Sequence, residues 1–239
     1  KYPMAIPFFH SKEGMDMAHR IVASGGDLWG VDQVFVVAPR YLFAKLAKVA
    51  ASKEANELAA KYAKRAQETF NAAMSSGNPG DVILQQLTDP EFDKLREAFA
   101  DQASAIEMIG QIQLSRDIYQ YWYDGEYYQN NKVRSDLMKR LFLQQYRNAS
   151  AQADLPRVMF KLGSNHAVRG LTSTYLYDLG NTVTELAAIN GTSSTHIRLT
   201  GARGTSYNML SGAQEFDSTE DWHEWLQNAL LGPLDEMES

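Results

Sequence analysis

The chain has 239 residues, of which 44% are hydrophobic, which is enough to bury a sizeable core in one domain. The net charge is −6, and no basic stripe carries interleaved aromatic residues, so we expect no nucleic-acid partner. The absence of cysteine excludes disulfides, cysteine nucleophiles and thiolate metal sites. No stretch approaches the roughly 18 apolar residues of a membrane span, and none has the apolar core of a signal peptide. These features predict a soluble protein, in a cytoplasmic or a bacterial extracytoplasmic compartment.

Residues 27–37, DLWGVDQVFVV, form the first predicted strand, because they are rich in Trp, Val and Phe and follow a Ser-Gly-Gly turn. From residue 41 to about 150, Ala, Lys, Glu and Leu dominate, and apolar residues recur at three-and-four spacing. We predict helices here, with breaks at residues 75–80 and at Gly125. Their ranges are 41–74, 82–87, 89–99, 104–123 and 131–147.

After Pro156 the pattern becomes strand, loop, helix and strand, over residues 157–165, 166–174, 175–189 and 195–200. Alternation of this kind implies parallel strands joined by right-handed crossovers. The sequence therefore predicts an α/β fold with a mainly parallel central sheet flanked by helices. We expect a single domain of residues 1–239, with a core of 20–40 and 155–239 and a large all-helical insertion over about 41–150. A short amphipathic helix is predicted over 219–230.

Polar side chains follow two of these strands, at the edge of a parallel sheet where ligands bind. Asn165, His166 and Arg169 follow one strand, and Asp32 and Gln33 lie on the other. An imidazole at this edge can act as general base or acid, with Asn165 donating to an oxyanion and Asp32 orienting the ring. The alternative is that His166 only satisfies loop carbonyl groups.

Other candidate residues have equally plain structural interpretations. Arg203 follows the last predicted strand and is placed either to hold an anion or to face solvent. Asp178 is interpreted as a helix cap or as a partner of a site residue. His196 is interpreted as a packed or edge side chain of a strand. For the tyrosines between residues 119 and 128, helix packing is favoured over a ligand-binding wall.

Three segments carry a resemblance to a known family. RVMFKLGSNHAVRG, residues 157–170, followed by YDLGNTVTELA, residues 177–187, resembles the C-terminal signature of the erythromycin esterase-like family of the ChaN-like and TraB-like superfamily. LWGVDQ, residues 28–33, is similar to the family's strand that ends in G-x-D. VRSDLMKRLFLQQY, residues 133–146, resembles its R-x-x-x-M helix, with Arg134 and Met138 on the matching positions.

The resemblance implies a hydrolytic site in a bacterial protein. On the matching positions it makes His166, Asp32 and Arg134 the catalytic residues, with no metal. Residues expected to bind substrate are Asn165, Arg169, Gln33, Trp29 and Arg203.

The family's N-terminal G-E-x-x-H motif has no counterpart here, because His10 lacks the preceding Gly-Glu. Either an upstream segment is missing, which the start at Lys1 favours, or this member has lost the motif. We therefore expect the catalytic set in this chain to be incomplete, and a homodimer or an accompanying fragment to cover an exposed sheet edge.

Two functions remain as hypotheses at this point. In the first, the protein is an esterase-like hydrolase whose histidine-centred site acts on a small-molecule substrate. In the second, it is a non-catalytic binding protein for haem or another hydrophobic ligand, using the same crevice and the tyrosine-rich helices. The sequence does not identify a substrate or a cofactor.

Overall fold

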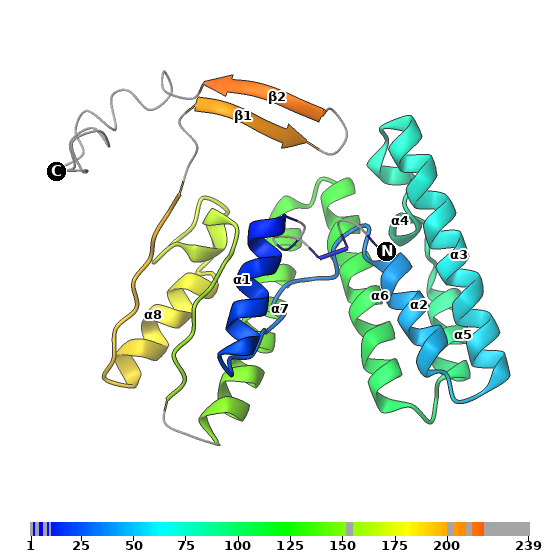
Figure 1. Cartoon of the computed structure of the whole chain (residues 1–239), viewed down its shortest axis with the longest axis horizontal. Coiled ribbons are helices and arrows are strands. Elements are labelled where there is room, and N and C mark those ends of the chain that lie inside the picture. The colour runs from blue at the N-terminus through cyan, green and yellow to red at the C-terminus, as the bar shows by residue number, and fades with distance from the viewer. Residues whose placement is uncertain are drawn as a thin grey trace. The chain divides into compact units, whose positions relative to one another are not determined.

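The computed structural model describes residues 2, 5, 6, 9, 11–151, 155–199, 203–208 and 212–217. The chain divides into two compact units, Lys1–His196 and Ile197–Ser239. The described part of the first unit is built from helices (Figure 1). They are α1 (Lys12–Ala23), α2 (Pro39–Val49), α3 (Lys53–Ser76), α4 (Ile83–Gln86), α5 (Asp89–Ala98), α6 (Ala103–Tyr123), α7 (Tyr127–Ser150) and α8 (Leu179–Ile189), with the 3₁₀ turns η1 (Pro79–Asp81) and η2 (Ser164–Ala167).

The predicted parallel central sheet is wrong. The sheet found in the described ranges is a two-stranded antiparallel hairpin in the second unit, formed by β1 (Arg203–Asn208) and β2 (Gly212–Asp217). Its register pairs Arg203 with Asp217 and Asn208 with Gly212. The fold that positions the site is therefore helical, and the sheet lies outside the unit that contains the site.

The three segments predicted as strands of this sheet have no ladder partners among their described residues. In residues 157–162 burial alternates, with Val158, Phe160 and Leu162 partly buried and Met159 71% exposed. This period-two pattern is what the sequence displayed, but a strand also requires backbone pairing with a neighbour. The apolar side chains instead pack against helices.

The end of the first predicted strand is also different. The amide of Ala38 donates to the carbonyl of Phe35 (2.7 Å), and α2 begins at Pro39. Proline suits the first helical position, because its fixed φ matches the helix and it has no amide to leave unpaired. Residues 35–38 therefore form a turn that leads into α2.

The predicted helical stretch of residues 41–150 is confirmed as helical, but the single helix predicted over 41–74 is two helices, α2 and α3. Local signals define the ends of α3 and the start of α5. Ser52 caps α3 by accepting a hydrogen bond from the amide of Ala55 (3.0 Å), and Gly77 ends it at φ = 70°. Thr88 and Glu91 form a capping box at the start of α5. These caps pair the amide groups that every helix start leaves without an intrahelical partner.

The main hydrophobic cluster joins α2, α3, α4, α5 and α6. Its largest fully buried side chains include Phe43, Leu46, Phe92 and Ile109. Phe43 stacks on Tyr62 with ring centroids 5.4 Å apart. Small alanines on α3 allow its neighbours to approach closely, so a long helix with a mostly polar outer face still contributes to the core.

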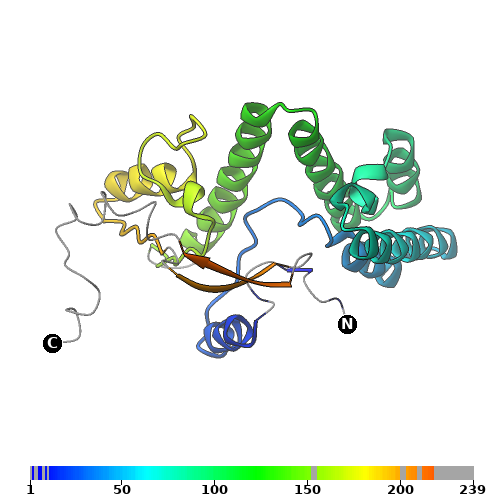
Figure 2. The same ribbon diagram turned by 90° about the horizontal axis from the view of Figure 1, so that it is seen from above.

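A second, smaller cluster lies at α7 and α8. Met138 and Phe142 of α7 and Leu179 of α8 are its fully buried members, and Phe160 packs edge-to-face on Phe142 at 5.0 Å. Figure 2 shows α6 and α7 diverging from the turn that connects them. The turn at Gly125 has φ = 78°, a conformation that glycine adopts without strain.

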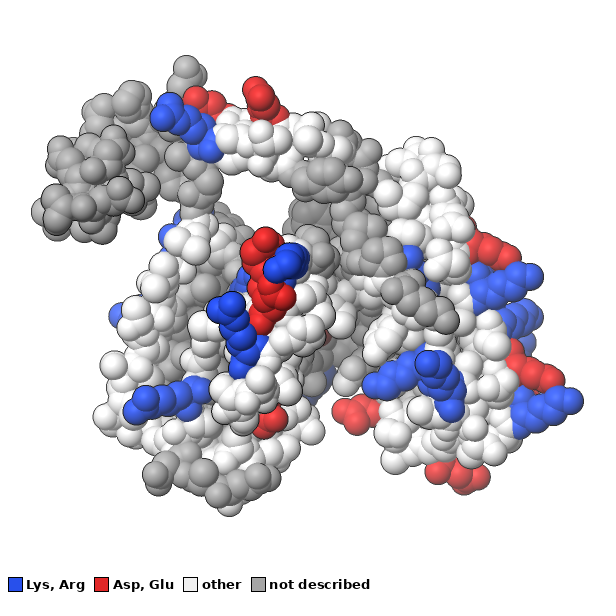
Figure 3. Space-filling view, in the orientation of Figure 1, with Lys and Arg blue, Asp and Glu red and all other residues white. Residues whose placement is uncertain are grey.

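The outer surface of α3 carries mixed charges, with Lys and Arg interspersed with Glu (Figure 3). Lys53 with Glu57 and Lys64 with Glu68 form exposed pairs four residues apart. Such pairs contribute little to stability but keep this face hydrated. Across the described ranges, we find no helix with the length and apolarity needed to cross a membrane.

Candidate functional site

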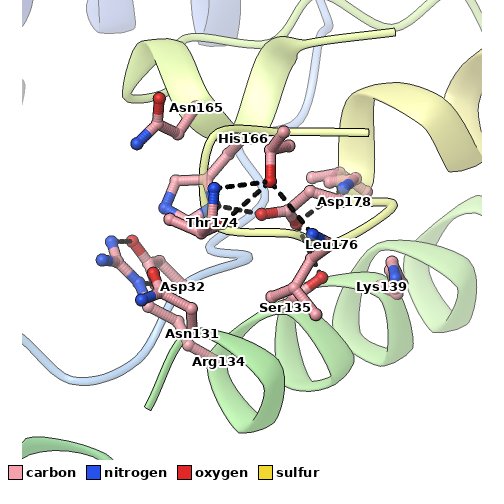
Figure 4. Close-up of polar contacts among 12 residues, drawn as sticks. Asp32, Asn131, Arg134, Ser135, Lys139, Asn165, His166, Thr174, Leu176 and Asp178 are labelled. Atoms are coloured by element: carbon pink, nitrogen blue, oxygen red, sulfur yellow. Dashed lines mark hydrogen bonds and ion pairs between the residues drawn. The ribbon is translucent and has the colours of Figure 1, made fainter. Parts of the chain in front are cut away.

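Asp178 is the organising residue of a buried polar cluster at the start of α8 (Figure 4). Its Oδ1 accepts hydrogen bonds from the amide of Leu179 (2.7 Å) and from the hydroxyl of Ser135 (2.8 Å). Its Oδ2 lies 2.8 Å from Nδ1 of His166. Asp178, Ser135 and His166 are all buried, so the three side chains form one connected group away from solvent.

The cluster favours a charged carboxylate. Burial alone would raise the pKa of Asp178, but hydrogen bonds from His166 and Ser135, the charge of His166 and the amide of Leu179 together lower that pKa below its ordinary value. A charged carboxylate only accepts hydrogen bonds, so Nδ1 of His166 carries the proton of this contact. In the neutral ring, Nε2 is then the basic nitrogen.

Nε2 of His166 has no hydrogen-bond partner among the described residues, and the His166 side chain is 10% exposed. An imidazole anchored at one nitrogen by a buried carboxylate and unpaired at the other is the arrangement that general acid–base catalysis uses.

Close backbone packing fixes the segment that carries His166. The amide of His166 donates to the carbonyl of Gly163 (3.0 Å) within η2, and the amide of Gly170 donates to the side chain of Asn181 (2.9 Å). At Gly180 a Cβ atom would lie 2.5 Å from the carbonyl carbon of Ala167 and 2.7 Å from the oxygen of Val168. Only glycine permits this approach, so α8 begins directly against the His166 segment.

The turn before Asp178 explains why the helix predicted from residue 175 begins only at Leu179. The amide of Thr172 donates to the carbonyl of Leu176 (2.9 Å), and its hydroxyl accepts from the amide of Thr174 (3.3 Å). Tyr175 at the tip has φ = 60°, which is incompatible with a right-handed helix. Threonine side-chain bonding to the backbone thus replaces the first predicted helical turn.

Asp32 and Arg134 form an ion pair beside the His166 cluster (Figure 4). Nε of Arg134 donates to Oδ1 of Asp32 (2.8 Å), and Nη2 donates to Oδ2, so the contact is bidentate. Burial lowers the pKa of Arg134, but the hydrogen bonds and charge of Asp32 outweigh burial and raise that pKa above its ordinary value. The charge of Asp178 acts in the same direction, so the ion pair and the histidine cluster share one electrostatic environment.

Tyr119 of α6 belongs to the same surroundings. Its pKa is raised, mainly because burial disfavours the charged phenolate, although a hydrogen bond with Gln33 and the charge of Arg134 oppose this. The phenol therefore stays protonated and contributes a neutral hydroxyl group next to the Asp32–Arg134 pair.

The structure brings some of the predicted site residues together and gives others different partners or surroundings. Asn165 points away from the Asp178 carboxylate (Figure 4), and its Oδ1 accepts from the hydroxyl of Ser173 (3.3 Å). Arg169 donates to the carbonyl of Ser194. Trp29 packs against the second hydrophobic cluster. Arg203 lies in β1, in the second unit.

The structure adds two contributions to the predicted site. Ser135 is absent from the set predicted from the sequence. It directly follows Arg134 on α7, and its hydroxyl donates to Asp178. Asp178 is predicted as either a cap or a partner, and it serves as both. Within the described ranges, no group of three or more metal-ligating side chains is present.

In comparisons with known proteins, no family model, no curated protein and no solved structure matches the chain. The resemblance to the erythromycin esterase-like family therefore stays a prediction, and the geometry of the cluster is the main basis for a function.

Proposed function

We propose that the protein is a hydrolase of ester bonds in which His166 is the general base. The observation that carries the proposal is the contact between Nδ1 of His166 and the buried carboxylate of Asp178, which makes Nε2 the basic nitrogen and leaves it without a partner among the described residues. The carboxylate fixes the tautomer and stabilises the imidazolium that forms when Nε2 takes up a proton.

The proposed reaction uses water as the nucleophile. Nε2 removes a proton from water as its oxygen bonds to the ester carbonyl carbon, and the carbonyl π electrons move to oxygen. The tetrahedral intermediate then breaks the bond to the alcohol oxygen, which receives the proton from the imidazolium. Ester and water become carboxylic acid and alcohol, and His166 returns to its neutral form.

Arg134 has the complementary role. Its guanidinium is held by Asp32 through Nε and Nη2, so Nη1 is the nitrogen that Asp32 leaves unengaged. We assign it to the negative charge that develops on the carbonyl oxygen. Asp32 then acts by orienting Arg134 rather than His166, which differs from the role that its place in the sequence predicted.

The test is hydrolysis of a panel of acyl esters and lactones by the full chain, in comparison with His166→Asn. Asparagine retains a donor near the position of Nδ1, so the contact to Asp178 is kept, but it has no base at the position of Nε2. We expect hydrolysis in the wild type and its loss in the variant, by about 100- to 10,000-fold. His19→Asn on the exposed side of α1 is the matched control, with unchanged activity expected.

Retained activity in His166→Asn would contradict the assignment. Inactivity of the folded wild type on the whole panel would count against ester hydrolysis and favour the binding alternative. That alternative has its own basis in the exposed aromatic residues at the α6–α7 turn, Trp122, Tyr123, Tyr127 and Tyr128. A Soret band on haem titration, absent in the Tyr123→Phe, Tyr127→Phe and Tyr128→Phe triple variant, would support it.

A further inference from the structure

His196 is the last residue of the first unit, and its side chain reaches back to the segment that carries His166. Its Nδ1 lies 2.6 Å from the carbonyl oxygen of Ala167. Its Nε2 lies 3.0 Å from the hydroxyl of Ser194 and 3.1 Å from that of Thr184. Both ring nitrogens of His196 are therefore engaged, whereas only Nδ1 of His166 has a partner among the described residues.

The partners determine the tautomer of His196. A carbonyl oxygen only accepts, so Nδ1 of His196 must carry the hydrogen. In the neutral ring Nε2 is an acceptor. The hydroxyl of Thr184 donates to the carbonyl of Gly180 (3.0 Å). The hydroxyl of Ser194 lies 3.4 Å from that of Thr184 and 3.0 Å from Nε2, and we assign its hydrogen to the shorter contact, with Nε2. One consistent set of hydrogen bonds satisfies the whole group.

The carbonyl that His196 contacts belongs to Ala167, between the candidate base His166 and the start of α8. Ala167 directly follows His166 and ends the η2 turn. The same carbonyl oxygen lies 2.6 Å from the position that a Cβ of residue 180 would occupy. The start of α8 and the imidazole of His196 thus both constrain this peptide group, which is attached to the candidate base.

We propose that His196 is a positioning residue for His166: its Nδ1–H fixes the Ala167 carbonyl and thereby the direction in which Nε2 of His166 faces. The consequence for catalysis depends on the proposed hydrolytic function, whereas the effect on the geometry of His166 does not. His196 itself has no free nitrogen with which to touch a substrate, so its role is indirect.

Three variants separate a positioning role from simple packing. His196→Asn places an amide donor near the position of Nδ1 and keeps the bond to the carbonyl. His196→Gln places its amide near the position of Nε2 instead. His196→Phe keeps most of the ring's volume and removes both hydrogen bonds.

The first measurement is ¹⁵N NMR of the histidine side chains at neutral pH. In the wild type we expect one tautomer for His166, protonated at Nδ1. We expect the same signals in His196→Asn, and averaged or broadened ring signals in His196→Phe and His196→Gln, because the turn is released. The second measurement is hydrolysis of any panel ester that the wild type cleaves, with kcat lowered about 10- to 100-fold in the Phe and Gln variants and KM little changed.

Unchanged His166 signals in both His196→Phe and His196→Gln would overturn the proposal. So would wild-type His166 signals in His196→Gln as well as in His196→Asn. If His196→Phe does not fold, the comparison of Asn with Gln decides the question. If the wild type hydrolyses no ester, the NMR comparison still tests the positioning role, so failure of the proposed function is distinguished from failure of this inference.

Discussion

The helices α2 to α6 and the segment of residues 155–196 are stabilised in different ways. The main cluster of α2 to α6 is lined by apolar and aromatic side chains, and capping residues define the starts of α3 and α5. The later segment has few fully buried apolar residues, and its conformation depends on Asp178, His166 and a close backbone approach at Gly180. Apolar packing is tolerant of small shifts, whereas hydrogen bonds depend on distance and angle.

The difference between the two regions determines which kind of substitution reaches the site. A cavity in the helical region lowers the free energy of unfolding without redirecting any polar contact. A change at the start of α8 alters the geometry of His166 even where its cost in stability is smaller. Substitutions in both regions can test whether stability and site geometry are separate in this way.

Leu46→Ala in α2 and Leu179→Ala in α8 remove the same group from fully buried positions. Each is expected to lower the free energy of unfolding by about 2–5 kcal/mol, from lost apolar burial and the cavity left behind. Urea unfolding monitored by circular dichroism measures this. Only Leu179→Ala is expected to change the NMR signals of His166, because residue 179 adjoins Asp178; equal disturbance by both would contradict the separation.

Gly180→Ala and Gly110→Ala form a second pair. A Cβ at position 180 would meet the backbone of Ala167 at 2.5 Å, so the segment that carries His166 must move, at a cost of about 1–3 kcal/mol. At position 110 in α6 nothing lies within 4 Å, and alanine is expected to stabilise the helix by about 0.5–1 kcal/mol. Thermal and urea unfolding measure whether each substitution raises or lowers the free energy of unfolding. Destabilisation by Gly110→Ala would contradict the account.

Asp178→Asn tests the buried carboxylate through the pH dependence of stability. The pKa of Asp178 is lower in the folded state than in the unfolded chain, where it is about 3.9. Its stabilisation is therefore complete above the unfolded value and is lost as the pH falls through the folded value. Asparagine can still cap α8, so the expected loss near pH 7 is about 1–3 kcal/mol, the cost of one hydrogen bond to a charged group.

The measurement for Asp178→Asn is the free energy of unfolding from pH 7 to pH 2. The difference between wild type and variant should shrink with acidification below about pH 5. Glu185→Gln changes an exposed carboxylate on the same helix and should leave the pH dependence unaltered. A wild-type advantage that persists at the lowest pH would show that Asp178 does not act through its charge.

The sequence predicted the helices well because their signals are local. Thr88 and Gly77 mark helix ends close to the predicted ones, whereas the cap at Ser52 was missed inside the range predicted as one helix, 41–74. The sheet was predicted wrongly because the alternation of Val158, Phe160 and Leu162 reports one buried face and contains no information about a ladder partner. The same apolar row packs against α7 without a neighbouring strand.

The candidate site could be predicted in part. His166 and Asp32 are indicated by their places on the predicted strands, and Arg134 by the resemblance; Asp32 and Arg134 form an ion pair. Ser135 could not be predicted as a partner of Asp178, because 43 residues separate the two and only the packing of α7 against α8 brings them together. Contacts of this kind depend on tertiary structure and leave no periodic signal in the chain.

Ser52→Ala is expected to have the smallest destabilising effect. It tests whether a loss of stability in α2 to α6 leaves the geometry of the segment 155–196 unchanged. The substitution removes the hydroxyl that accepts from the amide of Ala55 and should cost about 1 kcal/mol. Ser52→Asp retains a capping oxygen and should be nearly neutral. Urea unfolding measures both, and the His166 signals should be identical in the two variants, because a helix cap in α3 contributes stability and no orientation to the site. A Ser52→Ala variant with altered His166 signals would mean that the two regions are coupled through the packing of α6 and α7, and that stability and site geometry are not separable in this fold.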